Sequence, residues 1–308
     1  MKHALRIVAL VCLSTLLLVG AADTTASGAS AEALNLQPPT ADRLSTSPTG
    51  AFQPTSDRPP AEEGIRSNPE SRTVRPSTIG PSPATNTTAA LELLRVNEVW
   101  TDFDTRGENT TIAVLDSGVA TDAHQSLTLA DDGWKDFVDN RSDPIDDRNH
   151  GTVTSGVLVG TETPDGTHFG VSPNATLLHG KVIDSDGTAR TTNVLRGVEW
   201  AITHPQQPDV LLINVGHKRV YYDRYIEAIE RARDAGIYVV VPAGNEGDGG
   251  ITSPGSVYSA LSVGATNTTG AVEDYSVGNT ISTRARWGAR PIYEYDWPES
   301  YVVPTVVA

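Results

Sequence analysis

Short apolar runs alternate with amphipathic stretches over much of this 308-residue chain. In the first run, the residues from Ile112 to Leu115 are all apolar, and Asp116 follows directly. A run that is apolar at every position is typical of a strand buried on both faces of a parallel sheet. The same pattern predicts further strands at 176–183, 209–215, 237–247 and 260–266, and a short strand near Phe137.

The stretches between these strands have the spacing of helices. Helices are predicted at 89–100, 151–160, 191–204 and 221–236. Gly236 is expected to close the last of them, since glycine is favoured just after a helix end. Strands that alternate with helices predict an α/β fold, with a mostly parallel sheet and helices on both faces. After about Asn279 the pattern weakens, and the sequence becomes rich in aromatic residues and proline.

The N-terminal part of the chain has a different composition. Residues 1–31 combine a basic start, an apolar segment and small residues, which is typical of a secretory signal peptide. The apolar segment is shorter than the roughly 20 residues that a membrane span needs, so we expect secretion and no stable span after cleavage. An uncleaved signal would instead act as an N-terminal membrane anchor. Residues 32–88 are rich in Ser, Thr and Pro and predict a disordered linker, and residues 89–308 predict the ordered domain.

Charge and cysteine content narrow the classes of partner and chemistry. The formal net charge is −15, which argues against nucleic acid as a partner because binding it needs clustered basic side chains. Acidic residues are abundant and lysines are few, which suits a halophilic source, although an ordinary acidic secreted protein has a similar balance. Cys12, the single cysteine, lies in the predicted signal. The exported protein would therefore have no thiol, disulfide or cysteine metal site.

Three polar residues in the strand-and-helix pattern could carry chemistry. Asp116 ends a predicted strand, His150 precedes Gly151-Thr152 at a helix start, and Asn245 lies in a glycine-rich turn. Each also has a structural interpretation. Asp116 could cap a turn, His150 could cap its helix, and Asn245 could serve as a turn residue with positive φ.

Five segments resemble, in the right order, the motifs of subtilisin-like serine proteases (subtilases). They are IAVLDSGV (112–119), DRNHGTVTSG (147–156), GVSPNATLLHGKVIDSDG (170–187), VVVPAGNEGDGG (239–250) and SVYSALSVGATN (256–267). The resemblance covers about residues 96–266, and the acidic composition is similar to that of the halolysin-like members. Five ordered segments are far more specific than any one of them alone.

The resemblance implies a three-layer α/β fold and an endopeptidase that works through an acyl-enzyme. Asp116 would orient the histidine, His150 would act as general base and acid, and Asn245 would donate its side-chain amide to the oxyanion. The backbone that pairs with a protein or peptide substrate would come from Asn214, Val215, Gly216, Ala243 and Gly244. Where the family usually has Asn-Met-Ser-Leu-Gly, residues 214–218 are Asn-Val-Gly-His-Lys, so the preferred substrate side chain is not implied.

The serine of the family is missing from the sequence. The family carries it in a Gly-Thr-Ser segment, and no such tripeptide occurs here. We therefore expect 89–308 to be a C-terminally incomplete peptidase domain, inactive as given. The alternative is a catalytically inactive relative that acts as a peptide-binding or interaction module. A nucleotide-binding α/β protein is disfavoured, because GNEGDGG lacks the spacing and the Lys of a phosphate loop.

The sequence assigns no metal ligands and no certain cofactor. Several carboxylates crowd the stretch 131–147, which could bind calcium. Their spacing matches no defined calcium loop, so a solvated acidic surface is the favoured interpretation. A folded inhibitory pro-domain, common in the family, is not evident in the Ser/Thr/Pro-rich stretch either.

Overall fold

The computed structural model describes residues 86–308 except residue 124. The predicted signal peptide, and the predicted linker up to residue 85, lie outside these described residues. Within the described part, no helix has the length and apolarity needed to cross a membrane.

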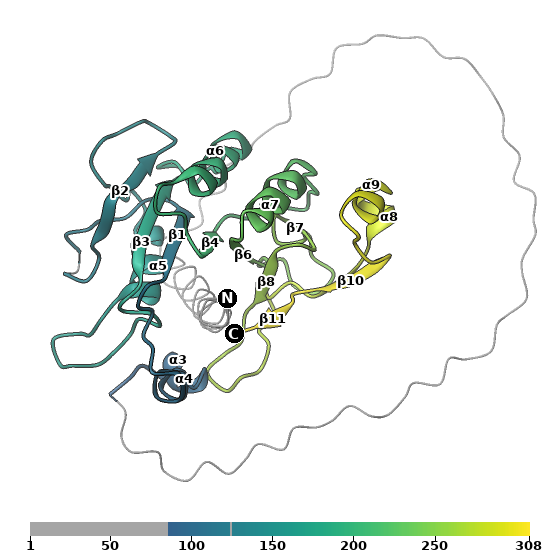
Figure 1. Cartoon of the computed structure of the whole chain (residues 1–308). Coiled ribbons are helices and arrows are strands. Elements are labelled where there is room, and N and C mark those ends of the chain that lie inside the picture. The colour runs from purple at the N-terminus through teal and green to yellow at the C-terminus, as the bar shows by residue number, and fades with distance from the viewer. Residues whose placement is uncertain (1–85, 124) are drawn as a thin grey trace, which may run out of the picture. The chain divides into compact units, whose positions relative to one another are not determined.

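A seven-stranded sheet forms the centre of the fold (Figure 1). Its strand order is β11-β8-β6-β4-β1-β3-β2, and every neighbouring pair is parallel. The bounds are β1 (Thr111–Asp116), β2 (Leu129–Asp136), β3 (Thr176–Lys181), β4 (Val210–Ile213), β6 (Tyr238–Pro242), β8 (Leu261–Gly264) and β11 (Val306–Val307). The strand that ends at Asp116 is therefore central, as expected for a run that is apolar at every position.

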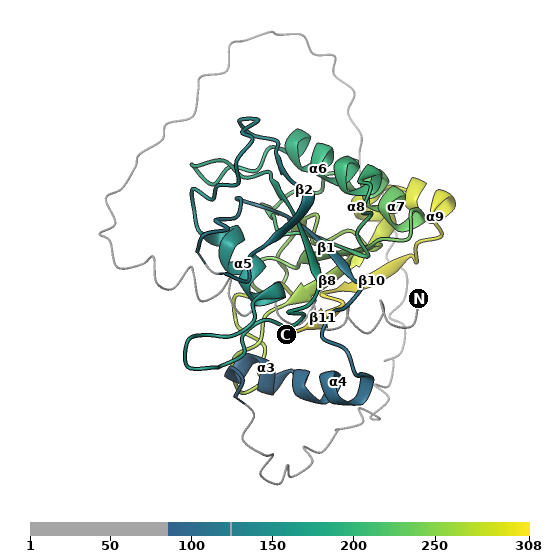
Figure 2. The same cartoon turned by 60° about the vertical axis from the view of Figure 1, so that its left-hand side comes forward.

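Helices cover both faces of this sheet. α5 (His150–Val159) lies on one face, and α6 (Thr191–Thr203) and α7 (Arg224–Asp234) lie on the other (Figure 2). The alternation of side chains along β1 shows this division, since Ile112 and Val114 share a core cluster with Leu158 of α5. The three-layer α/β architecture predicted from the sequence is confirmed.

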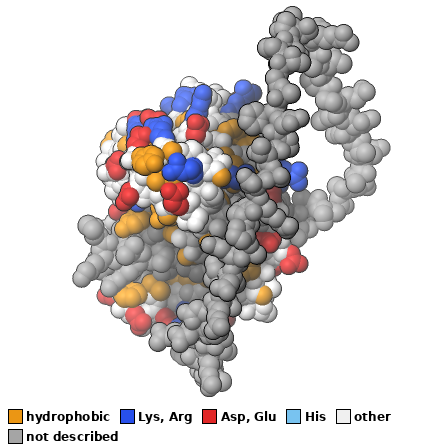
Figure 3. All heavy atoms as spheres, turned by 90° about the vertical axis from the view of Figure 1, so that its right-hand side faces the viewer, with side chains coloured by type: hydrophobic (Ala, Val, Ile, Leu, Met, Phe, Trp, Pro, Cys, Tyr) orange, Lys and Arg blue, Asp and Glu red, His pale blue; other side chains and the backbone are white. Residues whose placement is uncertain are grey.

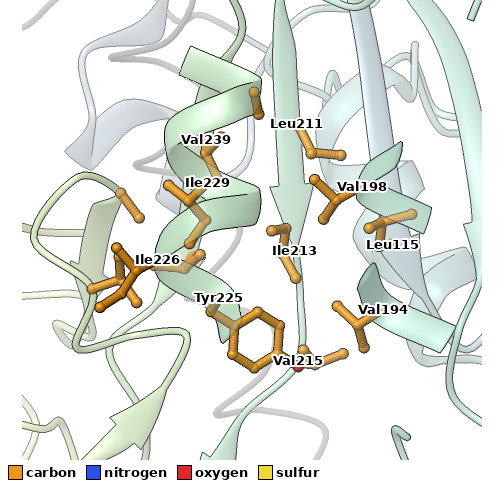
Figure 4. Close-up of a cluster of buried hydrophobic side chains, with 14 of the residues drawn as sticks. Leu115, Val194, Val198, Leu211, Ile213, Val215, Tyr225, Ile226, Ile229 and Val239 are labelled. Carbon is orange, nitrogen blue, oxygen red and sulfur yellow. The ribbon is translucent and has the colours of Figure 1, made fainter. Parts of the chain in front are cut away.

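The larger core lies between the sheet and the helices α6 and α7. Leu115, Leu211 and Ile213 of the strands face α6 and α7 in this cluster (Figure 4). The helices supply Val194, Val198, Tyr225, Ile226 and Ile229. All of these side chains are buried. This packing fixes the direction of β1 and β4, whose carboxyl ends carry Asp116 and Asn214.

The predicted helix at 89–100 is two helices. α3 spans Ala89–Leu93 and α4 spans Val96–Phe103. Arg95 between them has φ 56°, a left-handed conformation that a continuous helix cannot contain. Leu91, Val96 and Trp100 still pack together, so the apolar spacing indicated the buried face correctly but not the break.

The chain after β8 forms a small layer that the sequence pattern did not resolve. It contains β9 (Asn279–Ser282), α8 (Thr283–Trp287), α9 (Arg290–Glu294) and β10 (Ser300–Val303), with β9 and β10 antiparallel. A second antiparallel pair, β5 (His217–Lys218) and β7 (Thr252–Ser253), borders the site. Figure 3 shows the face that carries α8 and α9, where basic, acidic and hydrophobic side chains lie side by side.

Candidate active site

Asp116 is a fully buried carboxylate at the carboxyl end of β1. Its Oδ1 accepts a hydrogen bond from the backbone N–H of Ser117 at 2.6 Å. Its Oδ2 accepts one from Nδ2 of Asn214 at 2.8 Å. A buried carboxylate needs such donors, because an unpaired charge away from water is strongly unfavourable. The carboxylate is therefore held in one orientation at the end of the central strand.

His150 is the first residue of α5 and faces Asp116. Its Nδ1 lies 2.7 Å from Asp116 Oδ1. The side chain is 28% exposed, whereas that of Asp116 is fully buried. One edge of the imidazole thus contacts the carboxylate, and the ring borders an open cleft.

Glycine at position 151 lets α5 approach β1 this closely. A Cβ on Gly151 would lie 2.1 Å from the carbonyl oxygen of Gly118, and 3.1 Å from Cβ of Asp116. Gly118 itself has φ +122°, a backbone conformation that residues with a side chain rarely adopt. The two glycines therefore allow the backbone contact that places His150 beside Asp116.

Asp146 joins the same two elements. It accepts hydrogen bonds from Ser117 Oγ at 2.7 Å, and from the backbone N–H and Oγ1 of Thr152 at 2.8 and 2.6 Å. Burial opposes its ionisation, but the hydrogen bonds from Thr152 and Ser117 outweigh that effect, and the pKa of Asp146 is lowered from its ordinary value. Sequence reasoning did not single out this residue, because it lies in a run of acidic residues that looked like a solvated surface.

The cleft beside His150 has a volume of about 880 Å³. Asn245, in the turn after β6, lines it together with His150, so the structure brings Asp116, His150 and Asn245 to one place. Of the residues predicted to bind substrate, the cleft is lined by Asn214, Val215, Gly216 and Gly244. Ala243 is fully buried instead, and its backbone N–H donates to the carbonyl oxygen of Val263 in the sheet.

Asn214 has a second role that the sequence did not reveal. Besides bordering the cleft, its side chain donates to Asp116 Oδ2 and, at 3.0 Å, to Oγ1 of Thr154 on α5. The prediction considered only its backbone, as part of an extended segment that pairs with a peptide. Its position directly after an apolar strand, beside the strand of Asp116, was the available signal.

The carboxylate of Glu246 also lines the cleft. Oε2 of Glu246 accepts hydrogen bonds from Thr252 Oγ1 at 2.7 Å and from the backbone N–H of Asn245 at 3.2 Å. Its Oε1 lies 3.4 Å from Nζ of Lys218, an exposed side chain on β5. The lining of the cleft therefore includes side chains of both signs of charge.

The acidic stretch 131–147 is used within the fold. Asp136 is buried and accepts hydrogen bonds from the backbone N–H groups of Val138, Asp139 and Arg141. Across residues 86–308, with 124 left aside, no group of three His, Cys, Asp or Glu side chains converges as a metal site. The carboxylates of this stretch that the structure shows bonded accept from backbone N–H groups, from the hydroxyls of Ser117 and Thr152, or from basic side chains.

The site thus combines a buried carboxylate in contact with a histidine and a cleft that an asparagine also lines. The family model described as the subtilase family matches residues 107–290. The chain belongs to the subtilase family.

Curated relatives agree with this assignment. The chain is 31% identical over 214 residues to serine protease AprX of Bacillus subtilis (strain 168), a match that covers 65% of this chain and 47% of the relative. It is 32% identical over 185 residues to subtilisin NAT of Bacillus subtilis subsp. natto, covering 58% and 47%. The chain thus spans about half the length of these relatives.

A solved structure shows the same fold. The crystal structure of a lanthipeptide protease matches with a TM-score of 0.50 and 21% identity, over 59% of this chain and 56% of that one. At this identity the likeness concerns the architecture of the sheet and its helices.

Proposed function

We propose that the complete protein is a serine endopeptidase that hydrolyses internal peptide bonds of proteins or peptides through an acyl-enzyme. His150 takes the proton of the attacking hydroxyl and gives it to the leaving amine. Asp116 holds the imidazole in the required tautomer and stabilises its charged form, and Asn245 donates its amide to the oxyanion. The positions of these three side chains support the assigned roles.

One observation carries this proposal. Nδ1 of His150 lies 2.7 Å from a carboxylate that is fully buried and already fixed by two other donors. Such a carboxylate orients an imidazole more firmly than an exposed one, because its own position does not vary. Asn245 in the same cleft supports the assignment of an oxyanion donor.

The nucleophile of the proposed reaction is the serine of a Gly-Thr-Ser segment, and residues 1–308 contain no such segment. We propose that it is encoded beyond the codon for Ala308. The test is a DNA read through that codon and onward. An open frame that continues into a Gly-Thr-Ser segment supports the endopeptidase. A stop codon with no such segment in a nearby frame contradicts it and favours the second candidate, an inactive relative whose cleft binds peptides.

The role of His150 is tested in the full-length protein. We expect His150→Ala to lower kcat/KM for a peptide substrate by about 10² to 10⁴-fold, the usual contribution of a positioned acid–base group. His168→Ala is the matched control, since His168 does not line the cleft. Unchanged proteolysis by His150→Ala would exclude the proposed mechanism.

Export and salt adaptation are part of the same proposal. The basic, apolar and small-residue order of residues 1–31 supports cleavage as a signal and release of the remainder. Mass determination of the N-terminus of the protein recovered from the medium tests it. A net charge of −15 supports function in concentrated salt, which salt titration of the unfolding midpoint would test.

A further inference from the structure

Lys181 is a buried cation that the proposed mechanism does not use. It is the last residue of β3, it is fully buried, and it stands opposite Asp116 in the register of the parallel pair β1 and β3. A buried ammonium is strongly unfavourable unless its donors are paired. The contacts that compensate this burial therefore show what the residue holds together.

The Lys181 ammonium contacts three segments. It donates to the carbonyl oxygen of Ser117 at 2.6 Å and to that of Ile183 at 2.9 Å. It also lies 3.1 Å from Oδ2 of Asp147. Ser117 directly follows Asp116, and Asp147 lies in the loop that leads into His150. One side chain thus links the residue after the carboxylate to the segment before the imidazole.

Ser117 is held from two sides as a result. Lys181 donates to the carbonyl oxygen of Ser117. The Ser117 hydroxyl donates to Asp146 and accepts from the backbone N–H of Gly151 at 3.0 Å. Asp146 fixes the first turn of α5 through Thr152. The Lys181–Asp147 contact anchors the same loop one residue further along. The loop before α5 therefore has two adjacent attachments to the end of β1.

We propose that Lys181 and Asp147 are positioning residues that hold His150 against Asp116. The contact between Nδ1 and Oδ1 joins two separate elements, and its 2.7 Å distance depends on where the loop before α5 is attached. The inference rests on the role proposed above for this pair, but testing it does not require proteolysis. A change in stability alone does not decide it, because a buried ion pair can be replaced by apolar groups with little loss of stability.

The test follows the Nδ1 proton of His150 by proton NMR in the 308-residue chain, with His150→Gln identifying the signal. The variants are Lys181→Met and Asp147→Asn, singly and together. Lys135→Met, an exposed lysine on β2, is the matched control. We expect exchange of this proton with water to become at least about tenfold faster in both single variants, as for loss of a hydrogen bond to a charged group. The control should leave it unchanged.

The double variant shows whether the two side chains act as one attachment. We expect exchange in the double variant to be no faster than in the faster single variant, because both changes break the same contact. Fully additive effects, or an unchanged signal in folded single variants, would overturn the proposal. If Lys181→Met does not fold, Asp147→Asn decides the question, since that side chain is 23% exposed. A missing signal in the unaltered protein would instead contradict the Asp116–His150 hydrogen bond itself. Both the proposed endopeptidase and the proposed positioning role would then fail.

Discussion

The side-chain amide of Asn214 lies 2.8 Å from Oδ2 of Asp116, where Asp116 ends β1 and Asn214 directly follows the neighbouring parallel strand β4. Both are buried, so the amide replaces water as a donor to the carboxylate. This contact couples the strand that borders the cleft to the strand that carries the acid.

Replacing Asn214 by Leu removes that donor while keeping a side chain of similar size. We expect the free energy of unfolding to fall by about 1–3 kcal/mol, the usual effect of leaving a buried polar group without its partner. Urea unfolding measures the change. Asn193→Ala, at a partly exposed position on α6, serves as control and should change stability by less than about 0.5 kcal/mol. Equal effects of the two variants would contradict the importance of the Asn214 contact.

Two glycines on α5 are expected to respond in opposite directions to alanine. Gly151→Ala places a Cβ 2.1 Å from the Gly118 carbonyl oxygen, so the helix must shift, and we expect a loss of about 1–3 kcal/mol. A Cβ at Gly156 would lie 3.6 Å from Phe169, an ordinary van der Waals distance, so Gly156→Ala should stabilise the helix by up to about 1 kcal/mol. Thermal unfolding of both variants checks the prediction, and a neutral Gly151→Ala would refute the close contact.

His179 makes stability depend on pH. Burial lowers its pKa from 6.5 to about 4, and its Nε2 has no hydrogen-bond partner among the residues that the structure describes. The unfolded chain therefore takes up a proton between pH 6.5 and 4 that the folded protein does not bind, so stability falls as pH drops through this window. The full loss is about 3 kcal/mol.

His179→Gln should lack this part of the pH dependence. Urea unfolding at several pH values between 7 and 4 gives the slope of stability against pH for the variant and for the unaltered protein. The lowered pKa of Asp146 acts in a different window, because its stabilisation is lost only near and below its ordinary value of 3.8. Parallel curves for the variant and the unaltered protein would show that His179 is not the group responsible.

Two tryptophans in the C-terminal layer offer a matched comparison. Nε1 of Trp297 donates to the carboxylate of Glu230 at 2.8 Å, and Nε1 of Trp287 donates to the hydroxyl of Tyr301 at 2.7 Å. We expect Trp297→Phe to destabilise by about 1.5–3 kcal/mol more than the loss of ring volume alone, and Trp287→Phe by about 0.5–1.5, because the first acceptor is charged. Urea unfolding of both variants checks the order, and the reverse order would contradict it.

The strands of the main sheet were predictable because burial on both faces leaves a continuous apolar run. β3, β4, β6 and β8 lie within the predicted ranges, and β1 contains the predicted apolar run Ile112–Leu115 with one further residue at each end. β2 was harder, since exposed acidic residues at Asp131 and Asp132 interrupt it and it ends just before Phe137. α8 and α9 are only five residues each, too short for a helical period to emerge.

Sequence motifs singled out some residues of the candidate site but missed residues that join it only through contacts in the folded chain. Asp116, His150 and Asn245 stood out through their neighbours in sequence. Asp146 and Lys181 did not, because their roles come from segments far apart in the chain. A lysine inside the predicted buried strand 176–183 was the available signal, since a charge in a buried strand needs a partner.

The strand order has a consequence for how the chain reaches its native state. β1 lies between β3 and β4, and Ile112 pairs with Val210, which is far along the chain. The central strand therefore keeps an unpaired edge during synthesis until the residues of β4 have left the ribosome. Pairings this distant in sequence make folding slow. The interval exposes an apolar strand edge to aggregation, so we expect yield to depend on chaperones more than on the stability of the finished fold.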